Sequence, residues 1–162
     1  MPPKLKPRAP DDPGYRVVPS KSEVERHKSK AEWLALQREE ILEPDLPIID
    51  SHHHLWLRPG FRYLLDEYLA DVQTGHNIRA SVFIDCGAFY RKAGPDLLAP
   101  VGEVKFANGI AAPAASGTYG KTLVCAGIVG TANISVGTEV AQVLDTQIAI
   151  AGGRFRGIRD LS

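Results

Sequence analysis

Three consecutive histidines follow a β-branched apolar run, and this is the feature of the chain with the clearest chemical meaning. Residues 47–54 begin with Pro-Ile-Ile and predict a buried strand that ends in the histidines. Alternation along a strand places Asp50, His52 and His54 together on one face, with His53 facing away. Two imidazoles on one face can bind one divalent ion, and a nearby carboxylate can orient them. A fortuitous histidine run is the alternative, and the spacing alone leaves both open.

Other side chains of chemical interest are spread along the chain. Arg159 lies at the carboxyl end of the last predicted strand, where it can hold a substrate carboxylate, and a solvated arginine is the alternative. Asp85 either faces the same site or forms structural hydrogen bonds. Cys86 and Cys125 lie in apolar strands without a Cys-x-x-Cys spacing, which indicates buried thiols. Residues 115–122 fit the loosest form of a phosphate-binding loop, but a strand is predicted after them where that loop needs a helix, so an ordinary turn is favoured.

The elements that must position these residues alternate between strands and helices. The predicted strands are residues 47–54, 79–86, 122–129 and 154–159. Helical spacing of apolar residues predicts helices near 64–72, within 96–116 before Pro113, and near 140–148, where two glycines at 152–153 follow. The strands are apolar on both faces, as in a parallel sheet covered by helices, so the predicted fold class is α/β.

Length, composition and charge exclude several classes of protein. The 162 residues are about the size of one ordinary domain. Nineteen Lys plus Arg balance nineteen Asp plus Glu, so the net charge does not indicate binding to nucleic acid or to an acidic membrane surface. Two cysteines are too few for a disulfide framework, and no apolar run approaches the roughly 18 residues of a membrane span. We therefore expect a cytoplasmic protein that binds neither nucleic acid nor membrane.

The first part of the chain differs in composition from the rest. Residues 1–20 hold half of the twelve prolines and few apolar side chains, which predicts a flexible Pro-rich arm. Residues 21–43 lack both Gly and Pro, so we predict a helix there. Pro44 and Pro47 end it, which gives an N-terminal helical segment at 21–46 before the main domain at 47–162.

The histidine strand is also the first of a series of sequence blocks that resembles a known family. The blocks are residues 48–56, 62–65, 75–80, 82–86, 101–103, 106–111, 124–130 and 153–159. In this order they resemble the amidohydrolase-related proteins, the amidohydrolase family 2 group of TIM-barrel metal-dependent hydrolases. The resemblance covers almost all of the chain that follows the N-terminal segments.

This resemblance implies a fold, a cofactor and an activity. The implied fold is a partial (β/α)8 TIM barrel with about four βα units. His52 and His54 match the paired metal ligands of the family's first strand, and Asp50 is the leading carboxylate of that motif. Family members use a divalent ion, often zinc, to activate water against an ester, lactone or amide carbonyl, although some lactonase relatives are thought to work without it. The implied substrate is a small carbonyl compound such as a lactone or another cyclic ester.

The chain also departs from the family pattern. A complete barrel has eight strands and roughly 250 residues, whereas four strands are predicted here. The family's later His ligands and its last-strand Asp have no counterparts, so we expect the N-terminal half of a hydrolase, inactive alone and without an assigned catalytic residue. The alternative is a non-catalytic metal-binding or self-associating half-barrel that pairs its open edges as a homo-oligomer. A nucleotide-binding domain that uses the Lys121 loop is a weaker third hypothesis.

The barrel expected from the resemblance also predicts the order in which the strands pair. Its strands must pair in chain order through right-handed crossovers, with His52 and His54 on the concave side. A doubly wound sheet would instead place the first strand between the second and the third.

Overall fold

The computed structural model describes residues 25, 32–36, 39–58 and 61–160. The chain divides into two units, and the larger one comprises Glu40–Trp56 and Tyr63–Ser162. The predicted arm at 1–20 lies outside the described residues. Within the predicted helical segment at 21–46, residues 32–34 are helical and residues 39–46 contain no helix.

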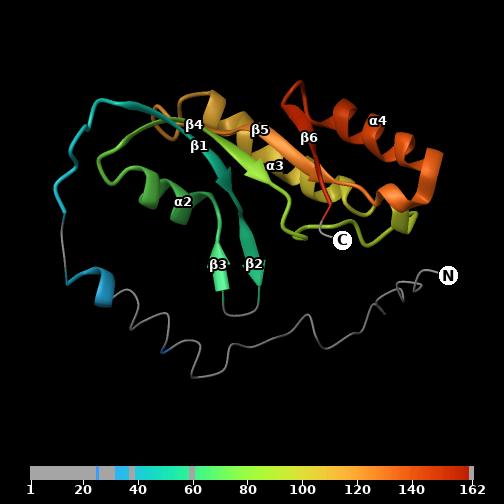
Figure 1. Ribbon diagram of the computed structural model, residues 1–162, viewed down its shortest axis with the longest axis horizontal. Helices are drawn as coiled ribbons and strands as arrows, with labels where there is room; N and C mark the ends of the chain where they lie inside the picture. The colour runs from blue at the N-terminus through green and yellow to red at the C-terminus, as the bar shows by residue number, and fades with distance from the viewer. Residues whose placement is uncertain (1–24, 26–31, 37–38, 59–60, 161–162) are drawn as a thin grey trace. The chain divides into compact units, whose positions relative to one another are not determined.

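Four parallel strands form the sheet of the larger unit (Figure 1). They are β1 (Pro47–His53), β4 (Asn77–Ile84), β5 (Leu123–Thr131) and β6 (Phe155–Arg159). The strands pair in this order, so each main strand lies beside the one that precedes it in the chain. The predicted α/β class and the predicted order of the strands are therefore confirmed, and β1 lies at an edge of the sheet.

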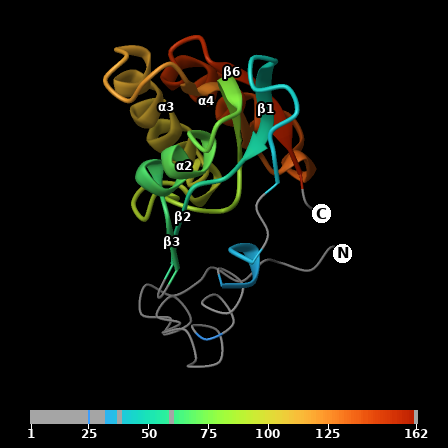
Figure 2. The same cartoon turned by 90° about the vertical axis from the view of Figure 1, so that its left-hand side faces the viewer.

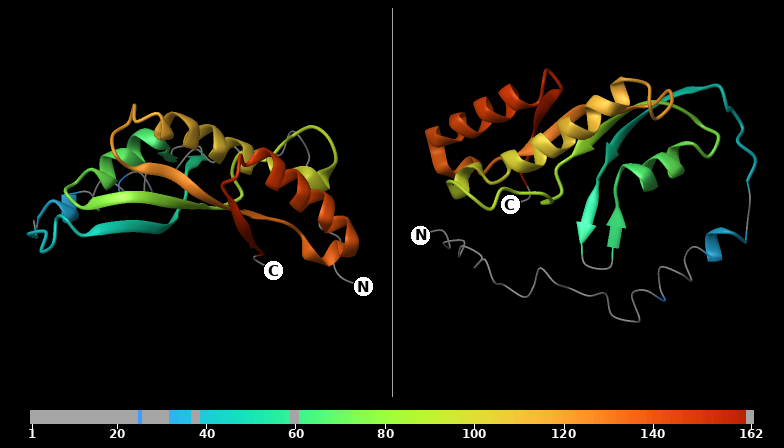
Figure 3. Two further views of the ribbon diagram at one scale, coloured as in Figure 1. Left: turned by 90° about the horizontal axis from the view of Figure 1, so that it is seen from above. Right: turned by 180° about the vertical axis from the view of Figure 1, so that it is seen from behind.

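Three helices cover one face of this sheet (Figure 2, Figure 3). They are α2 (Leu65–Val72), α3 (Val101–Ala115) and α4 (Val140–Ile150), and two 3₁₀ turns, Asp96–Leu98 and Ile134–Glu139, precede α3 and α4. No helix in the described part of the chain is both long and apolar enough to cross a lipid bilayer.

Helix α3 runs two residues past the proline that was expected to end it. Pro113 lies inside the helix, which continues to Ala115. A proline has no N–H for the carbonyl four residues earlier, which here belongs to Gly109. Because Gly109 is exposed, water can satisfy that carbonyl and the last turn tolerates the ring.

One hydrophobic core lies between the sheet and its helices. Leu65, Tyr68 and Leu69 of α2 meet apolar side chains of α3 and of the central strands in this core. The fully buried members with large side chains are Leu55, Phe83, Val104, Val124, Cys125 and Ile128. Small alanines on α3, among them Ala107 and Ala111, allow that helix to approach the sheet closely. The apolar stripe predicted for α2 packs in this core, whereas Ile148 of the stripe predicted for α4 is exposed.

A short hairpin between β1 and α2 was not predicted. Strands β2 (Trp56–Arg58) and β3 (Phe61–Tyr63) form a separate two-stranded sheet and run in opposite directions in Figure 1. Three residues are too few for an alternating pattern to stand out, so the sequence gives no strong signal for either strand.

The pairing of the main sheet is irregular at several points, and two of these irregularities reorient side chains near the histidines. From Asp50 to His53, three steps along β1 match the two steps from Ser81 to Phe83 on β4, so β1 carries one extra residue. A larger irregularity in β5 gives Cys125 a left-handed backbone with φ of 54°. The Cys125 N–H, displaced from the ladder, donates to the buried Ser81 hydroxyl at 3.2 Å. Such bulges change which face a side chain reaches.

A pair of glycine substitutions tests how tightly α4 packs on the sheet. A Cβ at Gly130 of β5 would lie 2.4 Å from Oε1 of Gln147 and 3.0 Å from Val104. The Gln147 side chain is fully buried and its Nε2 donates to the Thr131 carbonyl at 2.7 Å, so it has little freedom to move. We expect Gly130→Ala to lower the free energy of unfolding by about 1–3 kcal/mol, measured by urea denaturation.

The matched control is Gly109→Ala on the exposed side of α3, where an added Cβ meets nothing within 4 Å. Alanine has the higher helix propensity, so this variant should gain about 0.5–1 kcal/mol. Equal effects of the two substitutions would contradict the packing described for α4.

Candidate functional site

The carboxyl ends of three parallel strands bring the chemically active side chains together. His52 and His54 lie at the end of β1, Asp85 follows β4, and Arg159 ends β6. Both Asp85 and Arg159 lie close enough to His54 for their charges to affect its pKa. In parallel α/β sheets, ligands bind at the carboxyl ends of the strands. The described residues therefore offer one candidate site at these strand ends, built from segments more than 100 residues apart.

His52 and His54 face each other at the rim of the site. Their Nε2 atoms are 3.2 Å apart and their rings meet edge to face, with centroids 4.8 Å apart. Nδ1 of His54 lies 2.8 Å from the carbonyl oxygen of Ile84, which can only accept, so Nδ1 carries the proton. Nε2 of His54 is then unprotonated, and its lone pair points towards His52. Burial lowers the pKa of His54, which keeps this imidazole neutral at pH 7.

The prediction that Asp50 shares a face with the two histidines is wrong. The extra residue in β1 changes the alternation, and Asp50 reaches the helix-covered side instead. There Oδ2 of Asp50 accepts a hydrogen bond from the Tyr68 hydroxyl at 2.9 Å. Its Oδ1 accepts the backbone N–H of His52 at 3.1 Å, which fixes the local turn of the strand. Asp50 therefore supports the backbone of the histidine pair from behind.

His53 faces away from the pair, as the alternation predicts, and lies in the core. Its ring stacks on Tyr68 with centroids 4.3 Å apart, and its Nδ1 lies 3.0 Å from the Val82 carbonyl oxygen. Its Nε2 lies 3.6 Å from Sγ of Cys125. Burial lowers the pKa of His53 to about 4 and raises that of Cys125 to about 12, so the proton stays on sulfur. This contact resembles a Cys–His dyad but has the opposite electrostatics, because a reactive dyad needs a thiolate.

Arg159, expected as a substrate-binding residue, is held by Asp85. One terminal N–H of the guanidinium donates to the Asp85 backbone carbonyl, and Nε lies 4.0 Å from Oδ2 of Asp85. The Arg159 side chain is 26% exposed, and its Nε is buried without a hydrogen-bond partner among the described residues. Its own carbonyl accepts the Thr131 hydroxyl at 2.7 Å, which ties the ends of β5 and β6 together.

Two residues near Asp85 were not singled out from the sequence. The Tyr90 hydroxyl donates to Oδ1 of Asp85 at 3.0 Å, and burial raises the pKa of that hydroxyl. Glu103, in the first turn of α3, is 1% exposed and reaches the backbone after β4. An acidic residue in the first turn of a helix is ordinarily explained by the helix dipole, so the local pattern offers no reason to expect a buried glutamate.

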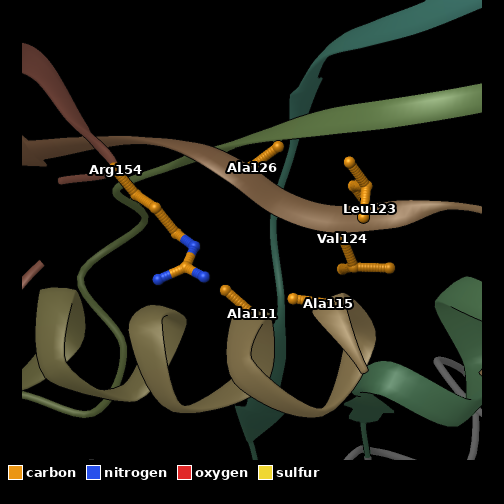
Figure 4. A pocket seen from close by; sticks show the side chains of 6 residues that line it. All are labelled: Ala111, Ala115, Leu123, Val124, Ala126 and Arg154. Carbon is orange, nitrogen blue, oxygen red and sulfur yellow. The ribbon is translucent and has the colours of Figure 1, made fainter. Parts of the chain in front are cut away.

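A pocket of about 220 Å³ lies between α3 and β5, at the opposite end of the strands from the histidine pair (Figure 4). Its lining is Ala111, Ala115, Leu123, Val124, Ala126 and Arg154. Leu123 begins β5 and Arg154 directly precedes β6, so this pocket is at the amino ends of the strands. It is smaller than the usual 300–1,000 Å³ ligand pocket. The neighbouring phosphate-loop pattern at 115–122 follows a helix and precedes a strand, as the sequence predicted for an ordinary turn.

Two further results bear on the candidate site. The described residues contain no group of three or more His, Cys, Asp or Glu side chains arranged to hold a metal ion. A scan against protein-family models, a search of curated proteins and a search of solved structures each gave no match.

The electrostatics of Cys125 lead to a direct test of reactivity. With a pKa of about 12, only about one thiol in 10⁴ is ionised at pH 8. Cys125 is also fully buried. We expect a small aromatic disulfide reagent to modify Cys125 of the folded protein only as fast as the chain unfolds, and to modify it at least 10³-fold faster in urea.

The Cys86→Ala variant isolates Cys125 for this measurement, because the chain has two cysteines. Rapid modification of Cys125 in the folded Cys86→Ala protein would show an ionised thiol paired with a protonated His53. That result would overturn the neutral pair described here.

Proposed function

We propose that this chain is part of an amidohydrolase-related hydrolase that acts on a small carbonyl substrate such as a lactone or another cyclic ester. In this proposal His52 and His54 bind a divalent ion, and zinc is the expected metal. The observation that carries the proposal is the histidine pair itself, with two Nε2 atoms 3.2 Å apart at the carboxyl edge of a parallel sheet. The resemblance of the sequence blocks to the amidohydrolase-related family supplies the reaction class.

The spacing of the two nitrogen atoms fits a shared ion. Zinc–imidazole bonds of about 2.0–2.1 Å at a tetrahedral angle place two ligand nitrogens about 3.3 Å apart. The observed 3.2 Å matches this, and the hydrogen bond from His54 to the Ile84 carbonyl is the second contact that metal-binding histidines ordinarily have. Without an ion, the same distance suits one N–H···N hydrogen bond in which His52 donates.

Each residue of the site has a defined part in this proposal. A bound ion would lower the pKa of a water molecule and polarise the substrate carbonyl. The Ile84 carbonyl holds the His54 imidazole, and Asp50 holds the backbone of His52, through the hydrogen bonds described above. In this proposal Arg159 orients an oxygen atom of the substrate through guanidinium N–H groups that do not bind Asp85.

We also propose that the four strands form one wall of a (β/α)8 barrel. Consecutive parallel strands with all three helices on one face support it, because barrel walls have this arrangement. His52 and His54 lie at the end of β1 where barrel active sites collect side chains. A hydrolytic zinc site has three protein ligands, and His52 and His54 supply two of them. In this proposal the remaining ligand comes from outside the described residues.

Metal binding by the histidine pair is the first test. We expect the wild-type chain to bind one zinc or cobalt ion weakly and reversibly, measured by equilibrium dialysis. The His52→Ala, His54→Ala double variant should lose this binding at least tenfold, because both lone pairs are removed. His76→Ala, at an exposed position after α2, is the matched control and should bind as the wild type does. Equal binding by the double variant would contradict the proposal.

The second test asks whether the bound ion has an open coordination position, which marks a catalytic ion rather than a structural one. Acetohydroxamate, a small carbonyl chelator, should change the visible spectrum of the cobalt-loaded protein. Hydrolysis of a simple lactone should stay at background, since losing a general base alone costs a factor of about 10²–10⁴ in rate. Zinc-dependent turnover that disappears in His54→Ala would show that two chains complete one site.

A second candidate function, self-association without catalysis, is favoured by the surface of the sheet. Among the described residues no strand of the main sheet pairs with the outer edge of β1 or of β6. Ile49 of β1 alternates with the inward-facing Asp50 and is 65% exposed on the face without helices. Unpaired strand edges and exposed apolar side chains drive pairing with other chains.

Sedimentation of the purified chain tests this candidate. We expect a dimer or larger species for the wild type, and a shift towards monomer for Ile49→Lys, because a charge on an edge strand opposes pairing. The control is Ile148→Lys, a 54% exposed position on α4 that lies on the outer surface of a helix. A wild-type monomer with a cooperative melt would exclude self-association.

A further inference from the structure

Two buried carboxyl groups interact beyond the end of β4, and one of them, Asp85, also interacts with His54. Asp85, directly after β4, is 6% exposed, and Glu103 of α3 is 1% exposed. Removing two negative charges from water costs several kcal/mol for each unless they are compensated. Arg159 is the cation that the structure brings to Asp85, so at most one of the two carboxyl charges is balanced.

The hydrogen bonds of Glu103 decide which of its oxygens carries a proton. Its Oε1 accepts three donors, the N–H of Cys86 at 3.0 Å, the N–H of Ala88 at 3.1 Å and the thiol of Cys86 at 3.2 Å. These donors occupy the lone pairs of Oε1, so that atom cannot also hold a proton. A neutral Glu103 must therefore be protonated on Oε2.

The surroundings of Oε2 fit a proton at that position. Oε2 is buried and has no donor partner among the described residues. Asp85 is within hydrogen-bonding reach of the Glu103 side chain, but two carboxylates offer only acceptors to each other. A proton on Oε2 turns this contact into an O–H···O⁻ hydrogen bond to Asp85. Burial first, and then the hydrogen bond and charge of Asp85, raise the pKa of Glu103 to about 8.

The local backbone is shaped to hold Glu103 in this position. A Cβ at Gly102 would lie 2.4 Å from the Phe89 carbonyl oxygen and 2.7 Å from the Arg91 nitrogen. The segment after β4 therefore lies directly against the start of α3, and a side chain at 102 would push it away. Only this close approach lets one oxygen of Glu103 reach the N–H groups of both Cys86 and Ala88.

We propose that Asp85 and Glu103 form a carboxyl pair that shares one proton, and that this pair positions Arg159 at the mouth of the histidine site. The mouth is the part of the site at the carboxyl ends of β1 and β6, beside His54 and Arg159. The pair and its neighbours carry no net charge with the proton in place, since Arg159 balances Asp85. Asp85 then holds Arg159 through its backbone carbonyl and its carboxylate, and Tyr90 fixes the other carboxylate oxygen. Glu103 is a positioning residue, because it reaches the mouth only through Asp85.

Loss of the shared proton has a defined consequence. The titratable and charged groups that face the pair are Cys86 and Tyr90 from the segment after β4, Arg159 from β6, and His54 directly after β1. Without the proton, one cation faces two buried carboxylates, and the guanidinium is drawn towards them and away from the mouth. The effect on substrate binding rests on the proposed function, whereas the sharing of the proton does not.

Titration of the carboxyl groups by NMR tests the pair directly. The full chain is labelled with ¹³C at its glutamate carboxyl carbons and followed from pH 4 to pH 10. One signal, absent from Glu103→Gln, should titrate near pH 8. In Asp85→Asn the midpoint should fall by at least one pH unit, because the negative acceptor that stabilises the proton is gone. Glutamine keeps both an acceptor for Cys86 and Ala88 and a donor for Asp85, so Glu103→Gln should fold.

Each result decides the proposal. A Glu103 midpoint below pH 6, or a high midpoint that Asp85→Asn leaves unchanged, would overturn proton sharing, since the second result would assign the shift to burial alone. If Glu103→Gln does not fold, the high-pH signal is identified by its response to Asp85→Asn. The titration needs neither metal nor substrate, so a failure to bind zinc leaves its outcome intact.

The positioning of Arg159 has its own readout. The ¹⁵N signal of the Arg159 Nε should change with the same midpoint as Glu103, and this change should be absent from Glu103→Gln. An Arg159 signal that stays constant through the titration of Glu103 would overturn the positioning role.

Discussion

The candidate site depends on how β1 pairs with β4. One extra residue between Asp50 and His53 reverses the alternation of β1, so both of these side chains lie on the helix side. His52 and His54 are left at the end of the strand, where the carbonyl of Ile84 fixes the tautomer of His54. A regular strand would have sent Asp50 to the same face as the pair, and the Tyr68 hydroxyl would have lost its hydrogen bond to Asp50.

Burial sets the chemistry of the remaining groups around this edge of the sheet. Burial disfavours the charged forms of His53, Glu103 and the two thiols, because a charge there would lose its hydration. Asp85 and Arg159 form a pair of opposite charges, and each compensates the other. Imidazole nitrogens beside this ion pair are suited to binding a cation or a polar neutral molecule.

The strands and helices of the main domain were predictable because their signals are local. Runs such as 122–129 are apolar and β-branched enough to identify strands within two residues of their observed bounds. The order of the strands was expected from the resemblance to a barrel, because the alternation of strands and helices also fits a doubly wound sheet. The hairpin of β2 and β3, the bulge at Asp50 and the left-handed Cys125 depend on pairing with distant residues, which local patterns do not record. Burial of Glu103 likewise depends on contact with the segment after β4.

The consecutive order of the strands also bears on how the chain folds as it is synthesised. Each main strand pairs with the main strand that precedes it in the chain, through a crossover that contains a helix. No strand must wait for a partner from the far end of the chain, so the loop closed at each step is short and its entropic cost is low. β4 can dock on β1 before α3 leaves the ribosome, and each later unit adds to a sheet that already exists. The histidine pair would then form early, and Arg159 would reach it last.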